Sequence, residues 1–275
     1  MRLINSAFLA IILSGILLLN ANAAVAQAQD GKAAKRPPEY GPTSPHSLMA
    51  VASRKDPGVI AATSPNPSKA RWWLKRHKKK VMQAAQGRAE FVMIGDSLVH
   101  NFEKKGMRIW TLFYGRYQPL NLGFNRDATE NAIWRIENGE LDGLSPKLIV
   151  IMIGTNNGGL RFDPAEQTAD GIQLLIQTIQ SRQPASQILL LGVFPRGALP
   201  THPLRILNAE VNALLPGLAN ELGVHYLDIS PKFLDQNGVL QKTIMHDFLH
   251  PTTKGYQLWA ESIAPVVNRL LSPTE

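Results

Sequence analysis

The sequence predicts an α/β domain in three layers, with helices on both faces of a central parallel sheet of about five strands. Four runs of mostly apolar residues lack the polar alternation of strands that face water on one side. Segments with helical periodicity separate these runs, and such alternation of strands and helices is typical of a parallel sheet. A chain of 275 residues with 44% hydrophobic residues is long enough for one large domain or two small ones.

The strands of this sheet are predicted from short apolar segments bounded by turn residues. The first, FVMI at 91–94, stops abruptly at Gly95-Asp96-Ser97. The others are expected at 119–123, 148–153, 188–193 and, from a weaker pattern, 224–229.

Three longer segments are predicted as the covering helices, at 165–183, 203–222 and 254–271. In the first of them the apolar side chains fall on one helical face, as expected for a helix packed against a sheet: Ile172, Leu175, Ile176 and Ile179. We therefore assign 69–272 to a single domain without internal repeats.

The first residues have the pattern of a secretory signal peptide. Arg2 precedes the apolar run AFLAIILSGILLL, and small residues follow that offer cleavage sites after Ala23, Ala26 or Ala28. The alternative is a membrane anchor, but the apolar run is short for a span of about 20 residues. We interpret 1–28 as a signal peptide, which predicts a periplasmic or secreted protein.

Between the signal peptide and the domain, residues 29–68 are rich in Pro, Ala, Ser and Lys and lack sustained periodicity. This composition is typical of a flexible extension. The absence of cysteine excludes disulfides, a cysteine nucleophile and thiolate metal sites.

The net charge of +8 is concentrated in RWWLKRHKKK at 71–80. We favour a helix whose charges face water while Trp72 and Trp73 pack inward. The alternative is a surface that contacts an anionic lipid or polysaccharide of the cell envelope. Because no RNA-binding motif or zinc finger accompanies the run, nucleic acid is not expected as a partner.

Polar and glycine residues follow every predicted strand, and the carboxyl ends of parallel strands meet at one edge of the sheet. Ser97 follows the first strand, Asn156 lies in GTNNGG after the third, and MHDFLHPT at 245–252 follows the last. Ester hydrolysis needs a nucleophilic hydroxyl, a base, a group that orients the base, and donors for the oxyanion. Ser97, His250, Asp247 and Asn156 have the chemistry for these four roles.

Each of these residues also has a structural interpretation. Gly-Asp-Ser makes a common turn and helix cap, and GTNNGG a tight turn. His246 and His250 have the spacing of a zinc pair on a helix. However, Pro251 disfavours helical geometry at His250 and no third ligand is evident, so neither a metal nor a cofactor is expected.

Together, and in this order, IGDSL, NLG, IGTNN and DFLHPT resemble the four sequence blocks of the GDSL, or SGNH, esterase and lipase family. Within it the chain resembles the catalytic subunits of intracellular platelet-activating-factor acetylhydrolases and their bacterial relatives, over residues 70–271. The resemblance implies the flavodoxin-like SGNH hydrolase fold and a serine esterase. Because that subgroup forms dimers, it also makes a homodimer an expectation.

Carried over to this sequence, the resemblance makes Ser97 the nucleophile and an oxyanion N–H donor, Asn156 the side-chain oxyanion donor, His250 the base and Asp247 its orienting carboxylate. Asp96 is then structural. One departure concerns the second block, where the family usually has a glycine directly before the aspartate, and this chain has Arg126. The second backbone N–H donor is therefore Gly123 or Arg126.

The sequence thus predicts a secreted or periplasmic serine esterase that removes short acyl groups, acetyl above all, through a covalent acyl-enzyme on Ser97. The expected substrate is an acetylated glycan or lipid. The alternative is a non-catalytic module that binds carbohydrate or the cell envelope on the same fold. The basic run and the altered GFNRD loop are what keep this alternative open.

Overall fold

The computed structural model describes residues 70–272. The predicted signal peptide at 1–28 and the predicted extension at 29–68 lie outside these residues. Within 70–272, none of the helices is both long and apolar enough to cross a membrane.

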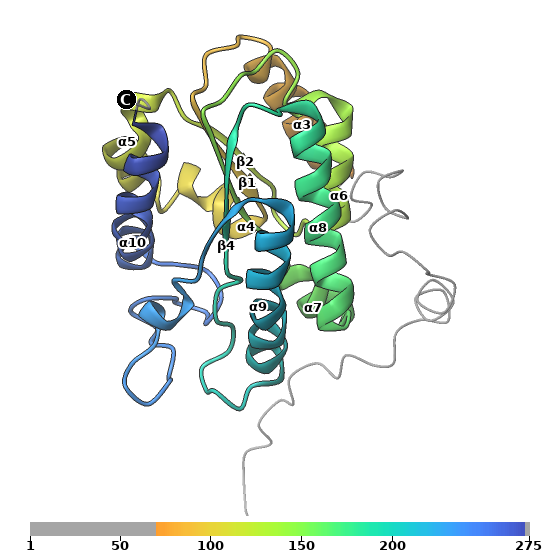
Figure 1. The fold of residues 1–275 in the computed structure, drawn as a ribbon. Helices are drawn as coiled ribbons and strands as arrows, with labels where there is room; N and C mark the ends of the chain where they lie inside the picture. The colour runs from red at the N-terminus through yellow and green to blue at the C-terminus, as the bar shows by residue number, and fades with distance from the viewer. Residues whose placement is uncertain (1–69, 273–275) are drawn as a thin grey trace, which may run out of the picture. The chain divides into compact units, whose positions relative to one another are not determined.

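The centre of the domain is a sheet of five parallel strands in the order β2-β1-β3-β4-β5 (Figure 1). The strands are β1 (Phe91–Gly95), β2 (Leu120–Gly123), β3 (Leu148–Met152), β4 (Gln187–Leu191) and β5 (His225–Leu227). The predicted α/β class, the parallel sheet and its number of strands are confirmed.

Strand β4 ends two residues before its predicted end at 193. The backbone N–H of Val193 donates to Asn212 Oδ1 at 2.7 Å, and Asn212 Nδ2 donates to the Val193 carbonyl at 2.9 Å. A side chain therefore takes the place of a neighbouring strand, which apolar periodicity does not reveal.

Helices cover both faces of the sheet. Figure 1 shows α5 (Met107–Tyr114) and α10 (Thr253–Leu271) on one face, and α6 (Thr129–Arg135), α8 (Ala165–Arg182) and α9 (Pro203–Leu222) on the other. The three helices predicted at 165–183, 203–222 and 254–271 correspond to α8, α9 and α10. The remaining helical segments of the described chain are α3 (Ala70–Ala84), α4 (Ser97–His100), η2 (Asn101–Glu103), η3 (Gly115–Tyr117), η4 (Ile136–Glu140), α7 (Thr155–Arg161) and η5 (Ser230–Phe233).

Alternation along the strands divides the core into two apolar clusters. Val92 and Ile94 of β1 belong to the cluster under α6, α8 and α9, and Phe91 and Met93 to the cluster under α5 and α10. All four are fully buried. Burial of both faces explains why the strands read as continuous apolar runs.

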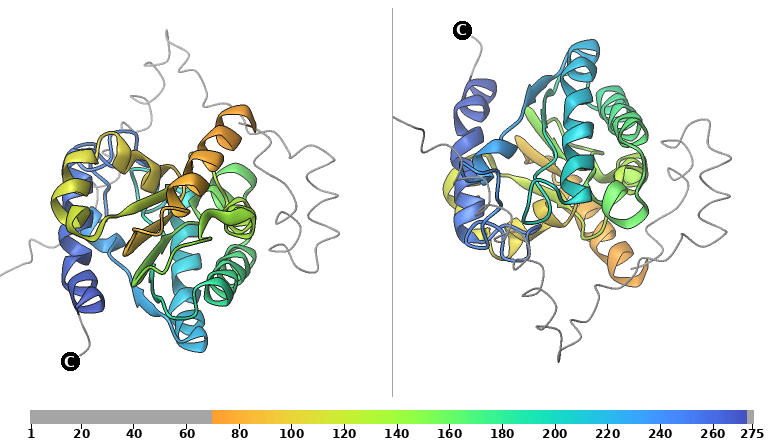
Figure 2. Two further views of the ribbon diagram at one scale, coloured as in Figure 1. Left: turned by 90° about the horizontal axis from the view of Figure 1, so that it is seen from above. Right: turned by 90° about the horizontal axis from the view of Figure 1, so that it is seen from below.

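The basic run at 71–80 lies in helix α3, and the structure corrects our interpretation of this run in two respects. Trp73 is fully buried, but Trp72 is 39% exposed. Arg76 and Lys80 point inward, and both form ion pairs with Glu103, at 2.7 and 2.6 Å. Only part of the run is therefore a solvated face. Figure 2 shows α3 in orange, and the helix packs against β2 and η4.

The chain leaves β1 toward β2 on one side and returns to β3 on the other. Connections that depart in opposite directions open a crevice at the carboxyl ends of the two strands, where ligands bind in folds of this kind. Ser97 follows β1 and Asn156 follows β3, so the topology places both residues at this crevice.

Gly123, at the end of β2, lies where the strand meets α4. A Cβ atom at this position would be 2.2 Å from the backbone nitrogen of His100 and 2.6 Å from the carbonyl carbon of Val99. Because both atoms belong to the main chain, a side chain cannot be accommodated without moving α4.

We expect Gly123→Ala to lower the free energy of unfolding by about 1–3 kcal/mol, because the added methyl overpacks the contact with α4. Gly217→Ala in α9 is the matched control, since its Cβ would meet nothing within 4 Å. Replacing this helical glycine should leave stability unchanged or raise it by up to about 1 kcal/mol. Urea denaturation of the two variants checks both signs, and equal effects would contradict the close approach.

Candidate active site

Ser97 is the first residue of α4, directly after the end of β1, and its side chain is nearly buried at 7% exposure. Asp96 caps this short helix by accepting from the backbone N–H of Leu98 at 2.8 Å. The Ser97 Oγ lies 2.9 Å from His250 Nε2, although 153 positions separate the two residues in the chain. The structure thus brings the predicted nucleophile and the predicted base into hydrogen-bond contact.

The segment before α10 folds back so that Asp247 reaches His250. Asp247 Oδ2 lies 2.7 Å from His250 Nδ1, and Asp247 Oδ1 accepts from the backbone N–H groups of Leu249 and His250 at 3.1 and 2.7 Å. Phe248 adopts a left-handed conformation with φ of 60°. A non-glycine residue in this region is uncommon and requires support from its surroundings. The hydrogen bonds of Asp247 to the backbone of Leu249 and His250 supply this support and hold the His250 side chain in place.

The ionisation of Asp247 sets the proton positions on His250. Burial alone would raise the pKa of Asp247, but hydrogen bonds from the ring and backbone N–H of His250 lower it to about 2. The carboxylate is therefore ionised and can only accept a hydrogen bond. His250 Nδ1 must carry the proton, which leaves Nε2 of the neutral ring free to accept the Ser97 hydroxyl.

Asn156 lies in the first turn of α7, after β3, and is buried. Its Nδ2 donates to the backbone carbonyl of Asp127 at 2.9 Å. A primary amide has two N–H groups, so this bond fixes the plane of the amide and leaves the second N–H for another acceptor. The neighbouring Asn157 instead binds Thr129, with its Oδ1 accepting from the Thr129 N–H at 3.1 Å.

The two candidates for the second backbone donor differ in the structure. The Gly123 N–H donates to Asn121 Oδ1 at 2.9 Å. The Gly123 N–H is thus engaged within β2, and its lack of a side chain allows the close contact with α4. Arg126 has φ of 68°, the left-handed region that favours glycine. A side chain is tolerated there, so the conformation is not restricted to glycine.

Asp96 has the structural position that the resemblance implies. Its side chain is fully buried, and burial raises its pKa to about 7 despite the hydrogen bond from Leu98. Its Oδ2 makes no hydrogen bond within the described residues. Asp96 faces the cap of α4 and is not the carboxylate that contacts His250.

The two histidines considered as a zinc pair do not have equivalent surroundings. Both ring nitrogens of His250 are taken up by Ser97 and Asp247, while the His246 ring lies against Lys105 Nζ at 3.3 Å. Among residues 70–272, no group of three or more histidines and carboxylates is placed to hold a metal ion.

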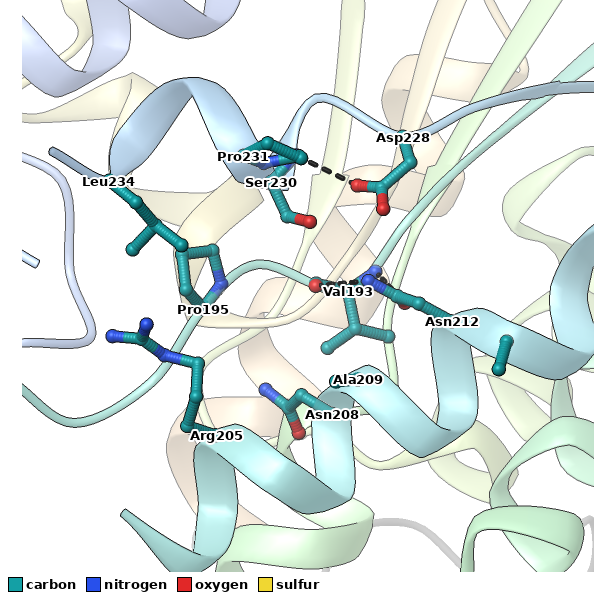
Figure 3. Close-up of a pocket in the computed structure, with 11 residues that line it drawn as sticks. Val193, Pro195, Arg205, Asn208, Ala209, Asn212, Asp228, Ser230, Pro231 and Leu234 are labelled. Carbon is teal, nitrogen blue, oxygen red and sulfur yellow. Dashed lines mark hydrogen bonds between the residues drawn. The ribbon is translucent and has the colours of Figure 1, made fainter. Parts of the chain in front are cut away.

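A separate cavity of about 350 Å³ lies between α9 and the segment that follows β5 (Figure 3). Two of its polar side chains are hydrogen bonded to the main chain: Asn212 to both backbone groups of Val193, and Asp228 to the N–H of Ser230 at 2.8 Å. The lining includes none of Ser97, Asn156, Asp247 and His250. This cavity is therefore distinct from the chemistry at Ser97.

Sequence reasoning missed the buried polar groups behind the site. Asp127 holds Asn156 through its carbonyl and is itself bound through its carboxylate by Trp73 and Arg135. The position of Asp127 in the NLGFNRD block was the available signal, since that loop follows a strand end. Nothing in the sequence pairs it with Arg135 or with Trp73.

Comparison with known proteins agrees with this geometry. Residues 93–258 match the model of the GDSL-like lipase/acylhydrolase family. The human platelet-activating factor acetylhydrolase IB subunit alpha1 is 36% identical over 201 residues, which cover 73% of this chain and 84% of the human protein. The rat subunit alpha2 is 36% identical over 206 residues, covering 74% and 86%.

Solved structures share the fold. A GDSL-like lipase from Bacteroides thetaiotaomicron superposes with a TM-score of 0.58 at 17% identity, covering 70% of this chain and 97% of that one. An acetyl xylan esterase superposes with a TM-score of 0.55 at 17% identity, covering 64% and 98%.

His100, the last residue of α4, makes the free energy of unfolding of the protein depend on pH. Burial and the nearby Arg76 guanidinium lower its pKa from 6.5 to about 4. Between these values the unfolded chain binds a proton that the folded chain does not, so stability falls as the pH is lowered from 6.5 to 4. At about 1.4 kcal/mol per pKa unit, the loss is at most about 3 kcal/mol.

We expect His100→Gln to remove this part of the pH dependence. Urea unfolding of both proteins at pH 6.5 and pH 4.5 gives the difference, in which other groups such as Asp96 cancel. Parallel changes in the two proteins would contradict the assignment to His100.

Proposed function

The chain belongs to the GDSL-like lipase/acylhydrolase family and is an ester hydrolase, and on this premise we propose that Ser97, His250 and Asp247 form its catalytic triad. The observation that carries the proposal is the continuous contact from Ser97 Oγ to His250 Nε2 at 2.9 Å and from His250 Nδ1 to Asp247 Oδ2 at 2.7 Å. An ionised carboxylate, a ring in one tautomer and a hydroxyl aligned in this order are the parts that acyl transfer requires.

In the first half of the reaction, Ser97 Oγ attacks the carbonyl carbon of the ester while its proton passes to His250 Nε2. The carbonyl oxygen becomes an oxyanion, which accepts hydrogen bonds from the Ser97 N–H, the second N–H of Asn156 and the backbone N–H of Arg126. Collapse breaks the bond to the alkoxy oxygen, and His250 returns the proton to the leaving alcohol. The acyl group remains on Ser97.

In the second half, His250 takes a proton from water as the water oxygen attacks the acyl carbon. The tetrahedral intermediate collapses, Ser97 Oγ recovers the proton, and the carboxylic acid leaves. Throughout both halves, Asp247 holds the imidazole ring and stabilises its protonated form.

Acetyl is the proposed acyl group and an acetylated glycan or lipid the proposed substrate. Two observations support this choice. The nucleophile is only 7% exposed and is followed by the fully buried Leu98, which favours a small acyl group. Similar proteins include platelet-activating factor acetylhydrolase subunits and an acetyl xylan esterase.

Export to the periplasm or outside the cell is also part of the proposal, supported by Arg2 and the apolar run that follows it. The mass of the mature chain, which should begin after Ala23, Ala26 or Ala28, tests this export.

A homodimer is proposed from the resemblance alone, and light scattering of the purified chain measures the oligomeric state.

We expect hydrolysis of p-nitrophenyl acetate to exceed that of the butyrate and octanoate esters and to be insensitive to EDTA. Ser97→Ala and His250→Ala should each lower kcat by ~10⁴-fold or more, and Asn156→Ala by ~10²–10³-fold. His225→Ala is the matched histidine control, because His225 lies on β5 and contacts Gln187 instead of the triad. Turnover that survives in folded Ser97→Ala would overturn the mechanism, and a folded wild-type chain without turnover would favour the binding module.

Contact of α3 with an anionic membrane surface is the remaining proposal. Lys75, Lys78 and Lys79 are exposed and form no ion pair within the described residues, and the exposed Trp72 and Met82 lie on the same helix. A face that combines lysines with large apolar side chains suits anionic lipid headgroups.

Changing Lys75, Lys78 and Lys79 together to Gln should lower partitioning onto phosphatidylglycerol vesicles by about 100-fold, at about 1 kcal/mol per lysine. Co-sedimentation with vesicles measures this partitioning, with phosphatidylcholine vesicles as the neutral control. Lys232, Lys242 and Lys254 are exposed elsewhere, so their change to Gln removes equal charge and should have a smaller effect. Equal losses for the two triple variants would assign the binding to net charge alone.

A further inference from the structure

A buried chain of hydrogen bonds connects α3 to the oxyanion side of the site. Trp73 Nε1 donates to Asp127 Oδ1 at 2.6 Å, and Arg135 Nε donates to Asp127 Oδ2 at 2.8 Å. All three side chains are fully buried. Both carboxylate oxygens of Asp127 are therefore held, one from α3 and one from α6.

The same residue holds Asn156 through its main chain. The Asp127 carbonyl accepts from Asn156 Nδ2 at 2.9 Å. Because a carboxylate fixed at both oxygens restricts the backbone that carries it, the direction of this carbonyl is set by Trp73 and Arg135. The carbonyl in turn sets the plane of the Asn156 amide, and with it the direction of the second N–H.

Arg135 also reaches the strand that carries the nucleophile. Its guanidinium lies over the Phe124 ring at 4.1 Å, and its Nη2 is 3.5 Å from the carbonyl of Gly95, two residues before Ser97. The Gly95 carbonyl also accepts from the Phe124 N–H at 3.0 Å. One rigid, planar cation thus touches both the end of β1 and the residue that holds the oxyanion donor.

Stability alone is a weak reason for such a network. Burying an ion pair is costly, and well-packed apolar side chains of similar volume often serve stability as well or better. What apolar side chains cannot do is fix the direction of a carbonyl and an amide. The left-handed conformation of Arg126, the residue before Asp127, also requires a neighbourhood that holds the turn.

We propose that Trp73 and Arg135 are positioning residues for the reaction, which act through Asp127 to aim the Asn156 amide at the oxyanion. Neither residue contacts the substrate. This inference rests on the proposed function, because it assigns a role in aiming a donor that the proposed mechanism uses. It makes α3, which lies outside the sheet and its connections, a part of the catalytic apparatus.

The first test is Trp73→Phe, which keeps an aromatic ring in place and removes the Nε1–H donor. On p-nitrophenyl acetate we expect kcat to fall about tenfold, a fraction of the 10²–10³-fold that loss of an oxyanion donor costs, with KM within about twofold. The matched control is Trp134→Phe. Trp134 packs against Trp73 at 5.3 Å between ring centroids, and its indole N–H makes no hydrogen bond within the described residues.

A double-mutant cycle separates positioning from a general loss of structure. If Trp73 acts through the Asn156 amide, Trp73→Phe should change kcat by less than about twofold in a protein that already carries Asn156→Ala. A tenfold loss in both backgrounds would overturn the proposal, as would an unchanged kcat in the single variant. Circular dichroism of each variant checks that the fold is retained.

Failure of the proposed function gives a different result. If wild-type protein shows no turnover, or Ser97→Ala retains it, the mechanism fails whatever Trp73 does. The geometry is then read from the side-chain amide signals of Asn156 in ¹H–¹⁵N spectra, assigned by their loss in Asn156→Ala. We expect Trp73→Phe to shift these signals and Trp134→Phe to leave them in place, and unshifted signals in Trp73→Phe would overturn the coupling.

Discussion

The ladder of backbone hydrogen bonds between β1 and β3 is the constraint on which the site depends. In this parallel pair Ile94 faces Ile151 and Gly95 faces Met152. The register fixes the two chain ends side by side, so Ser97 and Asn156 emerge next to each other while their connections depart in opposite directions. The pairing of β1 with β3 thus positions Ser97 and Asn156, whereas His250 reaches Ser97 from the segment that precedes α10.

Hydrogen bonds fix the direction of the polar side chains at the site. The buried Asp127 is bound at both carboxylate oxygens, the Asn156 amide is held by the Asp127 carbonyl, and the more exposed Asp247 accepts from the backbone and the ring of His250. Such groups gain little net stability from burial, but they allow few alternative directions. The exception is Asp96, whose second oxygen has no partner in the described part of the chain and whose pKa burial raises to about 7.

Helix α3 shows how a charge run divides when it folds against a core. Six of its residues between 71 and 80 are Lys or Arg. Arg76 and Lys80 turn inward to Glu103. Burial alone would raise the pKa of Glu103, but the hydrogen bonds and positive charges of these two side chains lower it to about 2, which keeps the carboxylate ionised. Lys75, Lys78 and Lys79 remain on the outer face. One helix therefore presents cations to water and a buried indole to the site.

The sequence by itself determined the fold class, the strands, the three long helices and the residue types at the strand ends, because periodicity and turn residues are local properties. It also identified Ser97, Asn156, Asp247 and His250 as candidates. Only the tertiary structure decided that Ser97 and His250 meet across 153 positions, that the Gly123 N–H is used by Asn121, and that Trp72 stays exposed. These facts depend on packing between distant segments, and the partners of Asp127 depend on it too, since no local pattern records which buried groups will find each other.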